Sequence, residues 1–305
     1  MDLVSVGTVA FDTIETPYGK AERVVGGAAT YISLAASYFT KNIGLVSVVG
    51  DDFPESELKY MQKRGINLEG LQIKEGEKSF FWAGRYHSNM NQRDTLTTEL
   101  NVLADFNPKL PESYRHAKIL MLGNLTPEIQ MKVIRQMKKQ PKLIVLDTMN
   151  FWMDVAMPAL KKVIKKVDVL TINDEEARQL SGEYSLVKAA KIIHKMGPKF
   201  LIVKKGEHGA LLFQGDNIFF APALPLAEVY DPTGAGDTFA GGFTGYLAQS
   251  GRPTMANLRR GVIYGSALAS FCVEEFSIGR LKGLGKREIN SRIKRFGKLV
   301  HFDMP

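Results

Sequence analysis

Apolar runs rich in β-branched residues alternate along the chain with segments whose apolar positions repeat every three or four residues. This alternation predicts repeated β-α units and a mostly parallel sheet. In the N-terminal part, a small-residue helix at 28–39 lies between two of the predicted strands. The predicted strands are 3–6, 43–49, 119–122, 143–146, 167–172 and 200–203. Ligands of such sheets bind beyond the carboxyl ends of the strands, so we expect the chemistry in the loops that follow them.

Two segments interrupt this rhythm, at 13–25 and about 71–103. Both lack helical periodicity and carry short alternating runs, such as the one from Ser79 to Tyr86. This pattern predicts extended strands that project from the main sheet. Two functions fit such an insertion: a lid that closes over a substrate and excludes water, or a flap through which two copies form a homodimer. The sequence leaves both open.

Length and composition are those of an ordinary globular protein. The 305 residues are 45% hydrophobic and 24% charged, which suits one large α/β domain over 1–305. No stretch reaches the roughly 18 apolar residues of a membrane span, and no signal-peptide pattern opens the sequence. The lone cysteine, Cys272, has no partner for a disulfide or a zinc site, which suits a reducing compartment. We therefore expect a cytoplasmic protein with no membrane partner.

The net charge of +8 raises the question of a nucleic-acid partner. The charges, however, are spread along the chain. Lys161, Lys162, Lys165 and Lys166 share a segment with apolar residues, as on the solvated face of an amphipathic helix. No nucleic-acid-binding motif accompanies them, so we expect no nucleic-acid partner.

The most informative stretch reads DPTGAGDTFAGGF and spans 231–243. Its first half has turn residues and its second half has helical periodicity, so its glycines lie at a loop-to-helix junction. There, the backbone N–H groups of Gly234, Ala235 and Gly236 can converge on a phosphate, and the helix dipole adds positive charge. Asp237 follows directly, as a carboxylate that can take a proton from a hydroxyl attacking phosphorus. The alternative is that Asp237 only caps the helix.

The whole stretch resembles the C-terminal signature of the ribokinase-like (PfkB) carbohydrate kinases, in which Asp-x-Thr-Gly-Ala-Gly-Asp supplies the anion hole and the catalytic base. The resemblance implies a ribokinase-like α/β fold, in which helices flank a mostly parallel central sheet and a small β lid is inserted in the N-terminal part. It also implies ATP and Mg²⁺ as cofactors, and a small polyol, sugar or nucleoside as phosphate acceptor.

The N-terminal run GTVAFD at 7–12, followed by Gly26 and Gly27, is similar to the family's acceptor-binding pattern. The resemblance implies that Asp12 and the two glycines contact the hydroxyls of the acceptor. Tyr31 stands where the family usually has an asparagine, which would reshape the acceptor pocket. Its ring could stack on a base or a sugar, or belong to the core.

Two further segments resemble nucleotide and metal motifs of the family. NDEE at 173–176 matches Asn-x-x-Glu, so Asn173 and Glu176 are expected to act on Mg²⁺ through water or phosphate, with a plain helix cap as the alternative. VKKGEHG at 203–209 matches the nucleotide loop Thr-x-Gly-x-x-Gly, with Lys204 in place of threonine before Gly206 and Gly209.

A monovalent cation such as K⁺ is a further expectation from the resemblance. Many members bind one with the residues that match Asp231 and Thr233, together with carbonyls of a loop that often reads Val-x-x-x-Gly. Here Val273 is followed four residues later by Ser277 in place of that glycine. The potassium expectation is correspondingly weaker than the expectation of ATP.

Several functions remain open on the sequence. The leading one is transfer of the ATP γ-phosphate to a hydroxymethyl group of a sugar, and a nucleoside acceptor is the alternative within the same chemistry. Arg85 and Arg93, in the predicted lid, could bind a phosphorylated acceptor or lie exposed on the surface. A non-catalytic binding or regulatory protein on the same fold is the alternative from another class.

Overall fold

A mostly parallel sheet lies at the centre of the protein. In the computed structural model, which describes residues 1–301 and 303, this sheet has nine strands. The architecture confirms the α/β expectation. In spatial order, the strands are β13 (Asn217–Ala221), β12 (Ala210–Gln214), β11 (Phe200–Lys204), β10 (Val169–Asn173), β9 (Leu143–Asp147), β8 (Ile119–Leu122), β1 (Leu3–Val6), β4 (Ile43–Gly50) and β5 (Ile66–Lys74).

The strands from β11 to β5 pair in parallel, and the carboxyl ends of β8 to β11 therefore meet at one edge. An antiparallel hairpin, β12–β13, extends the sheet beyond β11. The sequence pattern did not predict this hairpin.

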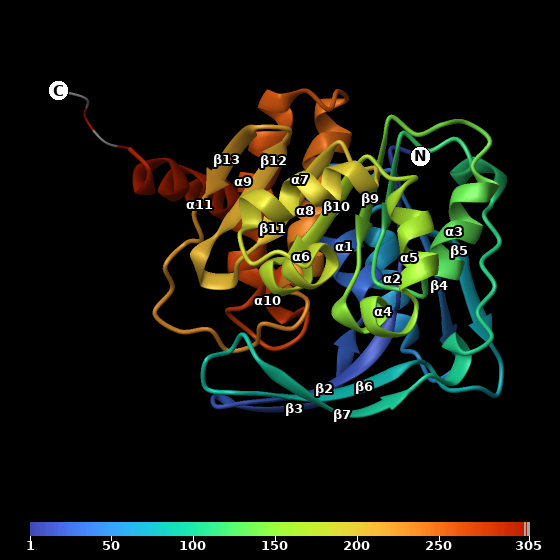
Figure 1. Cartoon of the computed structure of the whole chain (residues 1–305). Coiled ribbons are helices and arrows are strands. Elements are labelled where there is room, and N and C mark those ends of the chain that lie inside the picture. Colours follow the sequence, from blue (N-terminus) through green and yellow to red (C-terminus); the bar gives the residue numbers. More distant parts are fainter. Residues whose placement is uncertain (302, 304–305) are drawn as a thin grey trace.

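Helices cover both faces of the sheet (Figure 1). Side chains alternate between the faces, so Val145 packs in one core cluster while Ile144 and Leu146 pack in the other. One face carries α1 (Ala28–Ala36), α2 (Glu55–Lys63), α8 (Ala235–Ser250), α9 (Met255–Cys272), α10 (Gly279–Lys282) and α11 (Lys286–Leu299). The other carries α3 (Pro127–Gln136), α4 (Asn150–Val155), α5 (Met157–Ile164), α6 (Asp174–Ser181) and α7 (Leu186–Met196). None of the helices in the described ranges is long and apolar enough to cross a membrane.

Close packing of α8 against α1 fixes the position of the α8 N-terminus. Gly241 lies against the backbone of Ile32, and Gly245 lies against that of Ala36. A side chain at either glycine would push the two helices apart, because the nearest atom it would meet belongs to the backbone. The small residues thus hold the first turn of α8 over the carboxyl edge of the sheet.

A second, four-stranded sheet forms a separate layer at the bottom of Figure 1. Its order is β3 (Gly19–Gly26), β2 (Ala10–Thr16), β6 (Phe81–Tyr86) and β7 (Arg93–Glu99). We call this layer the lid. The second predicted lid segment began too early: 71–74 pairs with the end of β4 and belongs to β5 in the main sheet. The alternating pattern of residues could not show which of the two sheets 71–74 joins, because strands of both sheets are extended.

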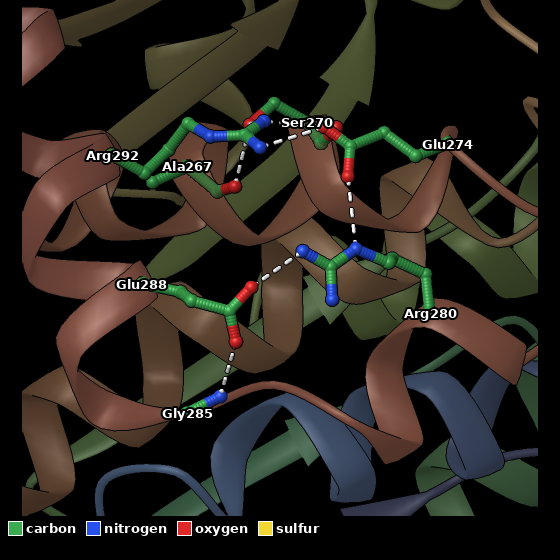
Figure 2. Close-up of polar contacts among 7 residues, drawn as sticks. All are labelled: Ala267, Ser270, Glu274, Arg280, Gly285, Glu288 and Arg292. Atoms are coloured by element: carbon green, nitrogen blue, oxygen red, sulfur yellow. Dashed lines mark hydrogen bonds and ion pairs between the residues drawn. The ribbon is translucent and has the colours of Figure 1, made fainter.

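A network of charged side chains ties α11 to the end of α9 (Figure 2). Glu274 accepts hydrogen bonds from Arg292 at 2.6 Å and from Arg280 at 3.0 Å. Arg280 also donates to Glu288 at 2.7 Å. The Arg292 guanidinium lies 3.7 Å from the centroid of the Phe271 ring and donates to the Ser270 hydroxyl. Glu274 is therefore the shared acceptor that joins both arginines.

Replacing Glu274 with glutamine should lower the free energy of unfolding by about 2–3 kcal/mol, because the nearly buried Arg292 loses its charged partner. Urea denaturation monitored by circular dichroism measures this change. The matched control is Glu275→Gln, which removes the same charge from an exposed neighbour. Equal stabilities of the two variants would show that the network contributes little.

Candidate active site

The candidate site lies at the carboxyl edge of the main sheet. Three neighbouring strands end there in a polar residue: β9 in Asp147, β10 in Asn173 and β11 in Lys204. The parallel pairing places Asn173 opposite Lys204 and Asp147 opposite Thr171, so the three strand ends lie at one edge of the sheet. The N-terminus of α8 faces the same edge, and it brings in the predicted anion-hole residues and Asp237.

The glycine turn opens α8 as the sequence predicts. Gly234 is the residue before the first turn and has φ +74°, a conformation that side chains disfavour. A Cβ atom there would also run into the ring of Tyr31, which is fully buried. Tyr31 therefore packs flat against the turn. Asp237 is the third residue of the helix and lies inside its first turn, whereas a capping residue would precede it.

Lys204 lies over the turn and forms an ion pair with Asp147. Its Nζ atom is 3.2 Å from Oδ1 and 3.3 Å from Oδ2 of Asp147. The two side chains are only 18% and 8% exposed. A Cβ atom on Gly236 would lie 3.0 Å from this Nζ, so the ammonium group is next to the predicted anion hole. Asp147 was not predicted from the sequence, although it directly follows the predicted strand 143–146 and therefore lies where chemistry was expected.

Two carboxylates near Lys204, those of Asp237 and Glu176, hold their protons more tightly than usual. Burial, together with the negative charge of Asp147, raises the pKa of Asp237 to about 7, against the opposing charges of Lys204 and Arg93. Burial also raises the pKa of Glu176 to about 7. Perturbed carboxylates that share one cleft with a buried lysine are typical of functional sites.

Asn173 and Glu176 form a reciprocal cap at the start of α6. The Asn173 Oδ1 accepts from the Glu176 backbone N–H, and Glu176 Oε2 accepts from the Asn173 backbone N–H, both at 2.7 Å. The cap that we considered as the simpler alternative is thus present. It also holds the Glu176 carboxylate beside Lys204, and the predicted action on Mg²⁺ stays a prediction.

Asp12, Gly26 and Gly27 come together at the junction of the lid and α1. The Asp12 side chain is buried, and its carboxylate occupies the space that a Cβ on Gly26 would need. Gly27 has φ +92° and precedes the first turn of α1. Burial and the charge of Asp231 raise the pKa of Asp12 to about 7. The structure therefore brings the predicted acceptor residues close to the anion-hole turn.

Asp231 stabilises the anion-hole turn by linking it to the loop after α9. Its Oδ1 accepts from the Thr233 backbone N–H at 2.8 Å, and its Oδ2 accepts from the Ser277 backbone N–H at 2.9 Å. Val273, beside Glu274, accepts from the backbone N–H groups of Tyr230 and Asp231. The loop after α9 thus positions the anion hole. A monovalent cation at Asp231 and Thr233 stays a prediction.

The nucleotide loop follows β11 and touches the lid. Gly206 has φ +54° and Gly209 has φ +81°. A Cβ on Gly206 would lie 2.6 Å from Oδ1 of Asn91, which belongs to the turn between β6 and β7. On the other side of the site, the hydroxyl of Tyr86 is 3.2 Å from that of Thr233. The β6–β7 hairpin therefore spans from the anion-hole turn to the nucleotide loop.

The two lid arginines lie on opposite faces of this hairpin. Arg93 is paired in register with Tyr86, so its side chain shares the face that touches the site. Arg85 lies on the other face, where it forms a bidentate ion pair with Glu15 at 2.8 and 3.2 Å. We call the Tyr86 side the inner face of the lid. The sequence could not predict which face each arginine lies on. A shift of one residue in the pairing of the strands would move every side chain to the opposite face.

These features define a class of protein. A mostly parallel sheet with a small β lid, and a glycine turn with a carboxylate in the first turn of its helix, are the marks of a ribokinase-like small-molecule kinase. Residues 1–280 match the pfkB family of carbohydrate kinases, and the chain belongs to this family. The resemblance seen in the sequence is thereby confirmed, and the chain is a sugar or nucleoside kinase of the ribokinase type.

Individual relatives agree with this assignment. The cytidine kinase of Thermococcus kodakarensis is 31% identical over 269 residues, which cover 86% of this chain and 94% of that protein. The solved nucleoside kinase of Methanocaldococcus jannaschii has a TM-score of 0.75 at 22% identity and covers 97% of this chain and 99% of its own. Arabidopsis thaliana ribokinase, solved with ribose and ATP, has a TM-score of 0.75 at 21% identity, with 96% and 98% covered. The two structures establish the shared fold alone.

Replacing Asp147 with asparagine should lower the pKa of Asp237 from about 7, because a negative neighbour is lost and the Lys204 charge is no longer compensated. Carboxyl ¹³C NMR titration of labelled protein measures this pKa directly. Asp154→Asn, on the exposed side of α4, is the matched control and should leave the titration of Asp237 in place. An unmoved Asp237 titration in Asp147→Asn would contradict the coupling.

Proposed function

We propose that the chain transfers the γ-phosphate of ATP to a hydroxymethyl group of a sugar or nucleoside, with Asp237 as the general base. One observation carries this proposal. The Asp237 carboxylate lies in the first turn of α8, beside the backbone N–H groups of the glycine turn and beside Lys204. A donor phosphate and an acceptor hydroxyl can meet there.

The chemistry follows from these positions. The acceptor hydroxyl gives its proton to Asp237, and its oxygen forms a bond to the γ-phosphorus while the bond from that phosphorus to the bridging oxygen breaks. The departing group is ADP. A pKa of about 7 suits the base, since Asp237 is then substantially ionised near neutral pH and still basic enough to accept a proton. The N–H groups of the turn and the Lys204 ammonium stabilise the phosphoryl oxygens.

Asn173 and Glu176 support a role for Mg²⁺. Carboxylate and amide oxygens suit this hard cation, which, when bound, would neutralise charge on the phosphates. Among residues 1–301 and 303, no three His, Cys, Asp or Glu side chains form a ready metal cluster. Phosphate oxygens and waters would therefore supply the remaining ligands. The excess of carboxylates around Lys204 favours such a cation.

The acceptor is a sugar or a nucleoside, and either one would react at Asp237 and the glycine turn. Asp12 beside Gly27 supports a grip on neighbouring hydroxyls, which sugars and nucleosides share. The name of the Thermococcus kodakarensis relative, a cytidine kinase, supports the nucleoside. A purely regulatory role is less well supported, because the base, the glycine turn and the buried lysine are all present.

Arg93 of the lid supports binding of the transferred phosphoryl group. It lies on the inner face of the lid between the contacts at Tyr86 and Asn91, and its charge acts on both Asp237 and Glu176. In this position the guanidinium can bind oxygens of the transferred phosphoryl group. Arg85 faces away, so the sequence-based idea of a paired arginine site for a phosphorylated acceptor loses one of its members.

Asp237→Asn tests the base. The amide keeps the size of the side chain but cannot accept the proton, so kcat should fall roughly 10²–10⁴-fold. Coupled detection of ADP release with sugars and nucleosides measures the rate. The melting temperature and the ATP affinity serve as controls and should change little. A folded variant with near-normal kcat would falsify the catalytic assignment.

Arg93→Ala should lower kcat roughly 10²-fold, because a cation near the transferring phosphoryl group is lost. Arg85→Ala is the matched control on the same hairpin. It removes an exposed ion pair with Glu15 and should leave kcat within about twofold. Arg93→Lys should recover part of the loss. Equal rates in the two alanine variants would argue that Arg93 is only a surface residue.

A further inference from the structure

Ser277 lies in the loop between α9 and α10 and donates hydrogen bonds in two directions. Its backbone N–H donates to Oδ2 of Asp231 at 2.9 Å. Its hydroxyl donates to the carbonyl oxygen of Val25, which comes 252 residues earlier in the chain. Val25 directly precedes Gly26 and Gly27, which we call the acceptor turn. One buried serine therefore joins the acceptor turn to the residue that stabilises the anion-hole turn.

The backbone conformation at Ser277 is unfavourable for a serine. Its φ is +59°, in the left-handed region that glycine adopts without a steric penalty and that other residues disfavour. A glycine at this position would keep the N–H bond to Asp231 and relieve the strain, but it would lose the bond to Val25. Strain that persists at a buried position beside a site points to a use for the side chain. The hydroxyl, which reaches the acceptor turn, is what the serine adds over glycine.

The two turns carry like charges and offer only acceptors to the space between them. Asp12 lies beside the acceptor turn, and the charge of Asp231 is one of the causes that raise its pKa. Ser277 supplies one donor to each side, to a carboxylate and to a carbonyl. The lid has a second contact with this region, from the Thr16 hydroxyl to the Tyr230 carbonyl at 3.0 Å, but it lies at the other end of the β2–β3 pair. The bond at Ser277 therefore links the two turns directly.

We propose that Ser277 is a positioning residue that sets the distance between the acceptor turn and the anion-hole turn. This inference rests on the proposed function. The acceptor is held at the first turn and the γ-phosphate at the second, so their separation decides whether the attacking oxygen lies within reach of the phosphorus. Ser277 touches neither ligand. It acts through Val25 on one side and through Asp231 on the other.

The link can be tested without phosphoryl transfer. In Ser277→Gly the fold should stay intact, because glycine adopts a φ of +59° freely. The bond to Val25 is lost, so amide hydrogen exchange, followed by mass spectrometry without ligands, should accelerate roughly 2- to 10-fold in segments 24–31 and 231–236. Thr16→Val is the matched control. It removes the other hydroxyl-to-carbonyl bond and should leave exchange in 24–31 unchanged. Unchanged exchange of both segments in Ser277→Gly would overturn the inference.

Kinetics separate positioning from a purely structural role. Ser277→Gly should lower kcat roughly tenfold, because the reacting groups are less well aligned, while relief of the strain offsets the lost bond and the melting temperature changes little. Ser277→Thr keeps the hydroxyl on a more strained backbone, so it should melt at a lower temperature but retain most of kcat. Thr16→Val should keep kcat within about twofold.

A near-normal kcat in Ser277→Gly would refute the positioning role. If the unmodified protein phosphorylates neither sugars nor nucleosides, the proposed function fails. Hydrogen exchange still decides in that case whether Ser277 joins the two turns.

Discussion

The crowding of negative charge around one buried lysine is the constraint on which the site depends. Asp147, Glu176 and Asp237 all act on Lys204, and the pKa values of Glu176 and Asp237 are raised as a result of burial. Such an arrangement costs folding free energy, since each carboxylate would be better solvated in water. A bound cation would offset part of this cost, as the proposed phosphoryl transfer requires.

The rest of the fold holds these groups at one edge. Parallel pairing aligns the ends of β9, β10 and β11, and close packing of α8 on α1 places the glycine turn above them. Asp231 then links this turn to the loop after α9, which the Glu274 network anchors to α11. Elements far apart in sequence therefore share the task of keeping a few polar atoms in place.

The sequence predicted what local patterns can encode. The strands, the glycine turn at 234–236 and the acceptor pattern around Asp12 each have a short signature, and the structure brings these residues together. The Asp147–Lys204 ion pair joins positions 57 residues apart, so no spacing rule could predict it. The faces on which Arg85 and Arg93 lie depend on strand register, and a shift of one residue would exchange them. The early start of the second lid segment has the same origin, because alternation does not say which sheet a strand joins.

The β6–β7 hairpin has one consequence for how the enzyme handles its substrates. Its two ends contact both halves of the site, through Tyr86 on the anion-hole turn and Asn91 on the nucleotide loop. Under the proposed function, a movement of this hairpin that admits the acceptor would also uncover the nucleotide side. Exchange of either ligand would then expose the other to solvent, and the time that the hairpin spends open would set how much ATP is lost to hydrolysis.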